Sequence, residues 1–201
     1  MIRILLFAFI ALAPTPLFAQ QNFQALAIGS AIPMGDVKMK SIDGKNYAIK
    51  DLSKKNGVMV MFSCNTCPVV VKYQSRTIEA IREAKKNDIG VILINSNEGN
   101  RANDDSYAAM QQYATNQGYD VPYVIDENSA LANIFGATRT PETFLFNAKG
   151  QLIYHGAMDD NQDATQATRK HLVTAISEVV NGKEISVNKT KSVGCSIKRK
   201  A

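Results

Sequence analysis

Val58-Met59-Val60-Met61-Phe62-Ser63-Cys64-Asn65-Thr66-Cys67-Pro68 is the stretch that decides the fold. It begins with a continuous apolar run, Val58 to Phe62, which is typical of a central strand covered on both faces. Cys64 and Cys67 follow at once, and the segment after them carries apolar residues at helical spacing. This order places a thiol near a helix N-terminus, where unpaired backbone N–H groups favour an anion. There the pKa of a cysteine can fall from about 8.5 to roughly 3.5–7.5, so we expect Cys64 to form a reactive thiolate.

The rest of the chain predicts strands and helices in alternation, which is the pattern of an α/β fold. Alternation of polar and apolar residues around a Gly-containing turn indicates an N-terminal β-hairpin. The order of elements predicts a central mixed sheet with helices on both faces. The predicted strands are 36–41, 46–49, 58–62, 89–94, 121–125, 143–146 and 151–155, and the predicted helices are 66–86, 106–116, 129–135 and 163–181.

Length and composition set the class of protein. The chain has 201 residues, 45% of them hydrophobic and 20% charged, as expected for a folded domain with a substantial core. The formal net charge of +5 is diffuse, so a nucleic-acid partner is not predicted. Cys64 and Cys67 could instead form a buried structural disulfide or half of a zinc site. Three cysteines and two histidines could supply four zinc ligands, but there is no second close-spaced pair. We therefore predict neither a metal nor a cofactor.

The N-terminus has the pattern of a secretory signal peptide. Arg3 precedes an apolar run from Ile4 to Ala13, and a small residue, Ala19, ends the segment. The run is shorter than the ~20 residues that span a bilayer, although a retained anchor or a buried strand stays an alternative. We expect residues 1–19 to be removed, residues 20–182 to form the domain and residues 183–201 to form a tail. The mature protein is then periplasmic or secreted, it meets a membrane only through the transient signal peptide, and its disulfides can persist.

Several motifs together resemble the thioredoxin superfamily. They are Cys64-Asn65-Thr66-Cys67 after a strand, Thr140-Pro141 before a hairpin, and a final helix. Over about Ile28 to Gly182 the chain is similar to the secreted redoxin branch, which includes alkyl-hydroperoxide-reductase/thiol-specific-antioxidant-like and cytochrome-c-maturation thioredoxins. The segment around Ala137–Phe144 is close to that branch's pattern. The resemblance implies a thioredoxin-like fold.

The resemblance also implies catalytic roles. Cys64 is expected to be an exposed nucleophile that forms a mixed disulfide with substrate, and Cys67 is expected to resolve that intermediate. Pro141 is expected to be a cis-proline facing the two cysteines. The backbone of Thr140 is expected to pair with the substrate's strand.

One position departs from the thioredoxin pattern. Thioredoxins carry a buried acid six residues before the nucleophile, and here that position is Val58. Glu142 is a candidate substitute, because related cytochrome-maturation proteins carry Glu at that place. An exposed charge on the hairpin is the alternative interpretation of Glu142.

Cys195 is the odd cysteine, in the ending Gly194-Cys195-Ser196-Ile197-Lys198. In one interpretation it is a third redox cysteine, on a tail that folds back over the active site. In the other it is a surface thiol or an intermolecular link.

The function predicted first is thiol–disulfide exchange by the Cys64–Cys67 pair. Its partners are then disulfide-bearing or dithiol proteins, exported like this chain, and a redox partner protein. A thiol peroxidase is an alternative, although that family's Thr or Ser and Pro positions are Met61 and Gly57 here. A copper chaperone of the cytochrome-oxidase-assembly type is another, with His155 or His171 as the distant ligand.

Overall fold

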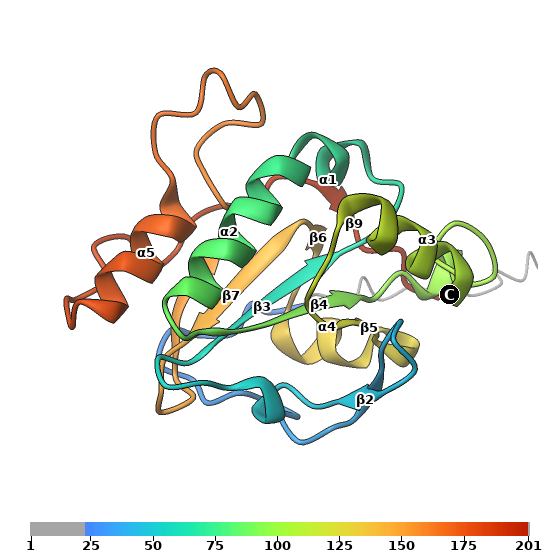
Figure 1. The fold of residues 1–201 in the computed structure, drawn as a ribbon, viewed down its shortest axis with the longest axis horizontal. Coiled ribbons are helices and arrows are strands. Elements are labelled where there is room, and N and C mark those ends of the chain that lie inside the picture. The colour runs from blue at the N-terminus through green and yellow to red at the C-terminus, as the bar shows by residue number, and fades with distance from the viewer. Residues whose placement is uncertain (1–22, 201) are drawn as a thin grey trace, which may run out of the picture.

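The computed structural model describes residues 23–200, so the predicted signal peptide lies outside the described part. A five-stranded mixed sheet with the order β5-β4-β3-β7-β8 forms its centre (Figure 1). Strands β3, β4 and β5 are parallel, while β7 runs antiparallel to both β3 and β8. The strands are β3 Val58–Ser63, β4 Gly90–Asn95, β5 Tyr123–Ile125, β7 Glu142–Phe146 and β8 Leu152–Gly156.

Helices and short strands surround this sheet. They are β1 Met39–Lys40, β2 Asn46–Tyr47, α1 Pro68–Lys72, α2 Gln74–Lys86, α3 Tyr107–Gln117, α4 Ala130–Phe135, β6 Arg139–Thr140, α5 His171–Val180 and β9 Cys195–Ser196. Short 3-10 turns lie at Lys50–Leu52, Glu98–Asn100 and Glu127–Ser129. Within residues 23–200, no helix is long and apolar enough to cross a membrane.

The side chains of β3 alternate between two cores, because successive residues of a strand point to opposite faces of its sheet. Met59 and Met61 pack with α2, α3 and α5 on one face. Val60 and Phe62 pack with α4 on the other face, where the Phe62 and Phe135 rings meet edge to face. All of β3 is buried, which confirms the central strand predicted from its unbroken apolar run. The predicted α/β architecture with helices on both faces is confirmed.

The N-terminal hairpin is confirmed but is shorter than predicted. Strands β1 and β2 pair over two residues each, with Met39 opposite Tyr47. Asp43 accepts hydrogen bonds from the Lys45 backbone N–H and the Tyr47 hydroxyl. These bonds fix the turn.

The single helix predicted over residues 66–86 is wrong, because the chain breaks at Tyr73. Tyr73 has φ −90° and ψ 0°, and its N–H lies within hydrogen-bond distance of both the Val69 and Val70 carbonyls. The preceding residues, Val69 to Val71, are β-branched and lose side-chain freedom in a helix. The break lets the buried Tyr73 hydroxyl donate to Asp159. Helix α1 therefore ends one turn after the cysteines.

The last helix begins later than predicted, at His171 rather than near Asp163. The intervening segment is held as a loop by two aspartates. Asp163 accepts from the backbone N–H and hydroxyl of Thr165, and Asp160 accepts from the backbone N–H groups of Thr168 and Arg169. Such bonds offer the backbone an alternative to the helix.

The tail has regular structure that its sequence does not predict. Residues Cys195–Ser196 form β9, which pairs antiparallel with β6, so that Cys195 lies opposite Thr140 (Figure 1). Earlier in the tail, Asn188 and Thr190 exchange backbone hydrogen bonds with His155 of β8. The tail therefore crosses from the edge of the sheet to the loop that precedes Pro141.

Candidate functional site

Thr140 brings the two cysteines of the Cys-x-x-Cys motif to one place. The Cys64 Sγ lies 3.2 Å from the Thr140 hydroxyl, and the Cys67 Sγ lies 3.4 Å from the Thr140 carbonyl oxygen. The Thr140–Pro141 peptide bond is cis, as the resemblance implied. The motif and the loop before β7 thus meet where the sequence predicted, at the ends of the neighbouring strands β3 and β7.

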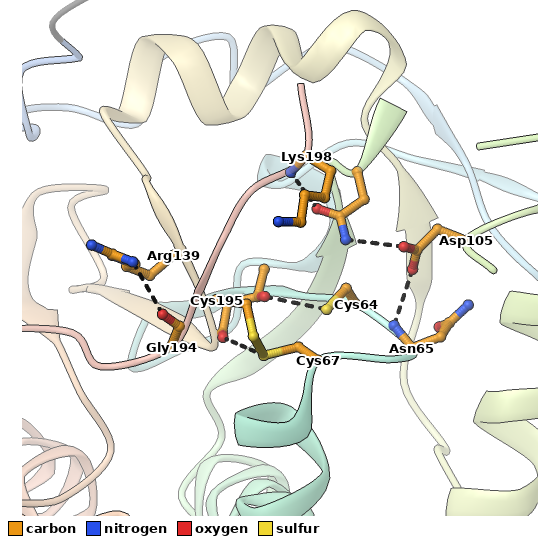
Figure 2. The surroundings of a disulfide bond; sticks show 10 residues. Cys64, Asn65, Cys67, Asp105, Arg139, Gly194, Cys195 and Lys198 are labelled. Atoms are coloured by element: carbon orange, nitrogen blue, oxygen red, sulfur yellow. Dashed lines mark hydrogen bonds between the residues drawn. A yellow bond between two sulfur atoms is a disulfide. The ribbon is translucent and has the colours of Figure 1, made fainter. Parts of the chain in front are cut away.

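Cys67 forms a disulfide with Cys195, and their Cα atoms are 6.0 Å apart across 128 positions of sequence. Cys64 is a free thiol in this structure. Figure 2 shows the Cys64 sulfur beside this disulfide. The interpretation of Cys195 as a surface thiol or intermolecular link is therefore wrong, since it is half-buried and bonded within the chain. Pairing of Cys64 with Cys67 stays a prediction.

The environment of Cys64 differs from the one expected. The side chain is buried rather than exposed. Burial raises the pKa of the Cys64 thiol, and the negative charge of Asp105 acts in the same direction, while the bond to Thr140 and the N–H groups of Thr66 and Cys67 lower it. The expected low pKa is wrong for this state because desolvation is the largest of these effects. Cys67, rather than Cys64, is the residue that precedes the first turn of α1.

Asp105 organises the loop between the two cysteines, and it was not among the predicted site residues. It is fully buried, and one carboxylate oxygen accepts from the Asn65 backbone N–H at 3.0 Å and from the Asn95 side chain at 2.7 Å. The other oxygen accepts from the Asn97 side chain. Asn65 also accepts from the Tyr123 hydroxyl. Asp105 ends the polar run 98–105, which predicts a loop, so its sequence context gives no signal of burial.

Glu142 is buried, and its interpretation as an exposed charge is wrong. One oxygen accepts from the backbone N–H groups of Thr138 and Arg139 at 2.8 and 2.9 Å, and the other lies 2.7 Å from the His155 Nε2. None of these bonds reaches a cysteine. Glu142 therefore shapes the loop that carries Thr140 and Pro141, while a role as substitute for the missing acid at Val58 stays a prediction.

Potential metal ligands do not gather at this site. Within the part of the chain that the structure describes, no group of three or more His, Cys, Asp or Glu side chains is placed to hold a metal ion. Of the two histidines that the copper-chaperone alternative could use, His155 lies 2.7 Å from Glu142 and His171 is the first residue of helix α5.

Comparisons with solved structures support the fold. An uncharacterized conserved protein from Geobacillus kaustophilus matches with a TM-score of 0.80 and 26% identity over 87% of this chain and 93% of its own. A peroxidoxin from Mycobacterium tuberculosis matches with a TM-score of 0.58 and 13% identity over 77% of this chain and 96% of its own. The thioredoxin domain of a thiol-disulfide oxidoreductase from Bacteroides vulgatus matches with a TM-score of 0.54 and 14% identity over 65% of this chain and 89% of its own. No curated protein matches the chain.

The sequence profile of the Redoxin family matches residues 27–176. This range holds the Cys-x-x-Cys motif, the cis Thr140–Pro141 bond and the whole central sheet. It ends before the tail with Cys195. The chain belongs to the Redoxin family.

Proposed function

We propose that the protein is a thiol–disulfide oxidoreductase in which Cys64 attacks the disulfide of a protein substrate and Cys67 resolves the mixed disulfide. The carrying observation is that both sulfurs contact Thr140, the residue before the cis-proline. A substrate sulfur bound beside Thr140 would meet Cys64, and Cys67, which contacts the same residue, can then attack the Cys64 sulfur. Membership of the Redoxin family supports redox chemistry at this place.

Each predicted site residue has a task in this proposal. Cys64 forms the mixed disulfide, and Cys67 attacks the Cys64 sulfur to release the substrate as a thiol. The backbone of Thr140 binds the substrate strand, and its hydroxyl donates to the Cys64 thiolate. Pro141 removes a backbone N–H from the loop and shapes the contact surface. Glu142 holds this loop through the Thr138 and Arg139 N–H groups.

The proposed substrates are exported proteins that carry disulfides or dithiols. The signal-peptide pattern of residues 1–19 supports export, and a disulfide within the chain is consistent with an oxidising compartment. Fusion of the first 30 or so residues to a reporter that is active only after export tests this part separately.

Insulin reduction with dithiothreitol tests the enzymatic proposal. We expect the protein to accelerate precipitation of the reduced insulin chains, and Cys64→Ser to lose the acceleration. Lys55→Ala, a change at an exposed side chain in the turn before β3 and at the end of that strand away from the cysteines, is the matched control and should keep the full rate. A rate equal to the blank, or a Cys64→Ser variant as active as the wild type, would contradict the proposal.

A further inference from the structure

We propose that the tail is a tethered substrate strand and that Cys195 is a third catalytic cysteine, which takes the disulfide from Cys64–Cys67 and passes it to an external dithiol. This inference rests on the proposed function and extends it to a relay with two sides. Cys64 faces the disulfide substrate, Cys195 faces the partner that restores the enzyme, and Cys67 bonds to each in turn.

Strand β9 lies where the substrate strand is expected. Thr140 is paired with Cys195 and Arg139 with Ser196 in an antiparallel register. The Arg139 guanidinium also donates to the Gly194 carbonyl oxygen at 3.2 Å (Figure 2). The chain therefore presents its own cysteine to Cys67 in the way that a bound peptide would present one.

Gly194 makes this close approach feasible. A Cβ atom on Gly194 would lie 2.1 Å from the Thr140 carbonyl oxygen, a backbone atom that cannot yield easily. Any other residue before Cys195 would push β9 away from β6. The Gly-Cys pair in the tail is thus matched to the loop that carries the cis-proline.

Contacts on both sides of Cys195 hold the tail in place without the disulfide. Before it, the Thr190 hydroxyl accepts from the Ala157 N–H at 2.9 Å, and its backbone pairs with His155. After it, Ile197 is buried in the core beneath α4, and its N–H donates to the Thr138 carbonyl. Such anchoring keeps a reduced Cys195 at high local concentration beside Cys67.

The end of the tail is also bound through side chains. The Lys198 N–H donates to the Asn97 side chain, which in turn donates to Asp105. The Arg199 guanidinium donates to the Asn133 side chain at 2.7 Å and to the Ala137 carbonyl at 2.6 Å. The tail is therefore connected to the same polar network that holds the loop between Cys64 and Cys67.

The three cysteine residues differ in exposure. Cys64 and Cys67 are 1% and 5% exposed, whereas Cys195 is only half-buried. An external thiolate therefore reaches the Cys67–Cys195 bond most readily at the Cys195 sulfur. While the tail is docked, the burial of Cys64 keeps external disulfides and thiols away from its sulfur.

The relay balances as a series of exchanges. In the reduced protein, while the tail is transiently undocked from Thr140, the Cys64 thiolate attacks a substrate disulfide. Cys67 then attacks the Cys64 sulfur, which forms Cys64–Cys67 and releases the second substrate thiol, and the tail docks again. The Cys195 thiolate attacks the Cys67 sulfur, which forms Cys67–Cys195 and expels Cys64 as a thiolate that takes up a proton.

An external dithiol closes the cycle. One of its thiolates attacks the Cys195 sulfur and Cys67 leaves as a thiolate. The second thiol of the partner then expels Cys195 and becomes part of the partner's own disulfide. Two electrons and two protons pass from the dithiol to the substrate disulfide over the whole cycle.

Rapid acid quenching and disulfide mapping by mass spectrometry test the relay. The fully reduced protein is mixed with one equivalent of hydroxyethyl disulfide and quenched over time. In the wild type we expect Cys64–Cys67 to form first and Cys67–Cys195 to replace it as the main species. Gly194→Ala should stop at Cys64–Cys67, with Cys195 open to alkylation, whereas Ser196→Ala, at an exposed side chain, should follow the wild type.

Cys195→Ser provides the second variant, in case Gly194→Ala disturbs folding. It should stop at Cys64–Cys67 and show a severalfold slower return to the reduced state with a reduced thioredoxin-type dithiol as probe. The relay is overturned if wild-type Cys195 stays an alkylatable thiol after turnover, or if Cys67–Cys195 stays intact throughout it. Insulin reduction that depends on Cys64 but not on Cys195 would leave the proposed function standing and remove the relay alone.

Discussion

At the scale of single residues, Thr140 connects all three cysteines. Its hydroxyl lies beside the Cys64 sulfur, its carbonyl oxygen contacts the Cys67 sulfur, and its backbone is in register with Cys195. When Cys67 is reduced, its thiol can donate to the carbonyl oxygen that it now only contacts. A change in the bonding among the cysteines therefore alters the contacts of one buried threonine.

Thr140→Val should make Cys64 less reactive in the form that contains the Cys67–Cys195 disulfide. The hydroxyl lowers the pKa of Cys64, so its removal raises that pKa further. A net hydrogen bond of about 1 kcal/mol corresponds to an approximately fivefold smaller thiolate fraction at neutral pH. The rate of Cys64 alkylation by iodoacetamide measures this, with Thr140→Ser as the control that keeps a hydroxyl. Equal rates in wild type and Thr140→Val would show that the hydroxyl does not stabilise the thiolate.

At the scale of elements, the predicted positions of the buried strands and of helices α3 and α4 are confirmed, whereas the unbroken helix over 66–86 and the early start of the last helix are not. Strands such as Val58–Ser63 are covered by helices on both faces of the sheet, so their unbroken apolar runs identify them in the sequence. The break at Tyr73 depends on Asp159, which is 86 positions away in sequence. The late start of α5 depends on Asp160 and Asp163, two residues of a type that can also cap the start of a helix. A single sequence does not reveal such long-range choices between local structures.

Strand β9 in the tail is the element for which the sequence gives the weakest signal. Residues 194–199 have no periodicity, and β9 is two residues long. Its place is set by the Gly194 backbone against Thr140, by the burial of Ile197 and by the contacts of Arg199, all of which are tertiary. The sequence suggested only that the tail could fold back, through the unexplained Cys195.

Ile197→Ala should loosen the tail without unfolding the domain. Truncating a buried isoleucine costs about 2 kcal/mol or more, which corresponds to an approximately thirtyfold larger undocked population of the tail. In the fully reduced protein, alkylation of Cys195 should therefore accelerate by a similar factor. Lys198→Ala, in which an exposed side chain is removed, is the matched control. Identical Cys195 alkylation in the two variants would mean that Ile197 does not hold the tail.

At the scale of the whole molecule, the site is assembled from segments that are far apart in sequence. The Cys-x-x-Cys loop, Asp105, the Thr140–Pro141 loop and the tail meet at one end of the sheet (Figures 1 and 2). The sequence predicted the first and third of these from their motifs. Asp105 and the tail could not be placed because their role follows only from the packing of the complete fold.

Burial of Cys64 should also make the stability of the whole fold depend on pH. The clean background is Cys67→Ser with Cys195→Ser, in which Cys64 is the only cysteine left. The pKa of Cys64 is raised in the folded state, so the unfolded thiol, with its ordinary pKa of about 8.5, loses its proton first. The stability that the buried Cys64 thiol contributes is therefore fully present below the unfolded pKa of about 8.5 and is lost as the pH rises toward the folded pKa.

Urea unfolding between pH 7 and 10 measures this effect. The free energy of unfolding should fall more steeply with pH in that background than after the further change Cys64→Ser. The difference between the two curves isolates Cys64 from the tyrosines, several of which also have raised pKa values, Tyr73 and Tyr154 at about 12. Parallel curves would mean that the Cys64 thiol is not desolvated when the protein is folded.

The central claim is that Cys64 is the cysteine that attacks the substrate, and trapping of the mixed disulfide tests it most directly. Reduced Cys67→Ser protein cannot resolve the intermediate, so incubation with insulin followed by acid quenching and mass spectrometry should find insulin chains bound to Cys64. Dithiothreitol should release them. Insulin bound only to Cys195, or no adduct at all in a folded variant, would contradict the account.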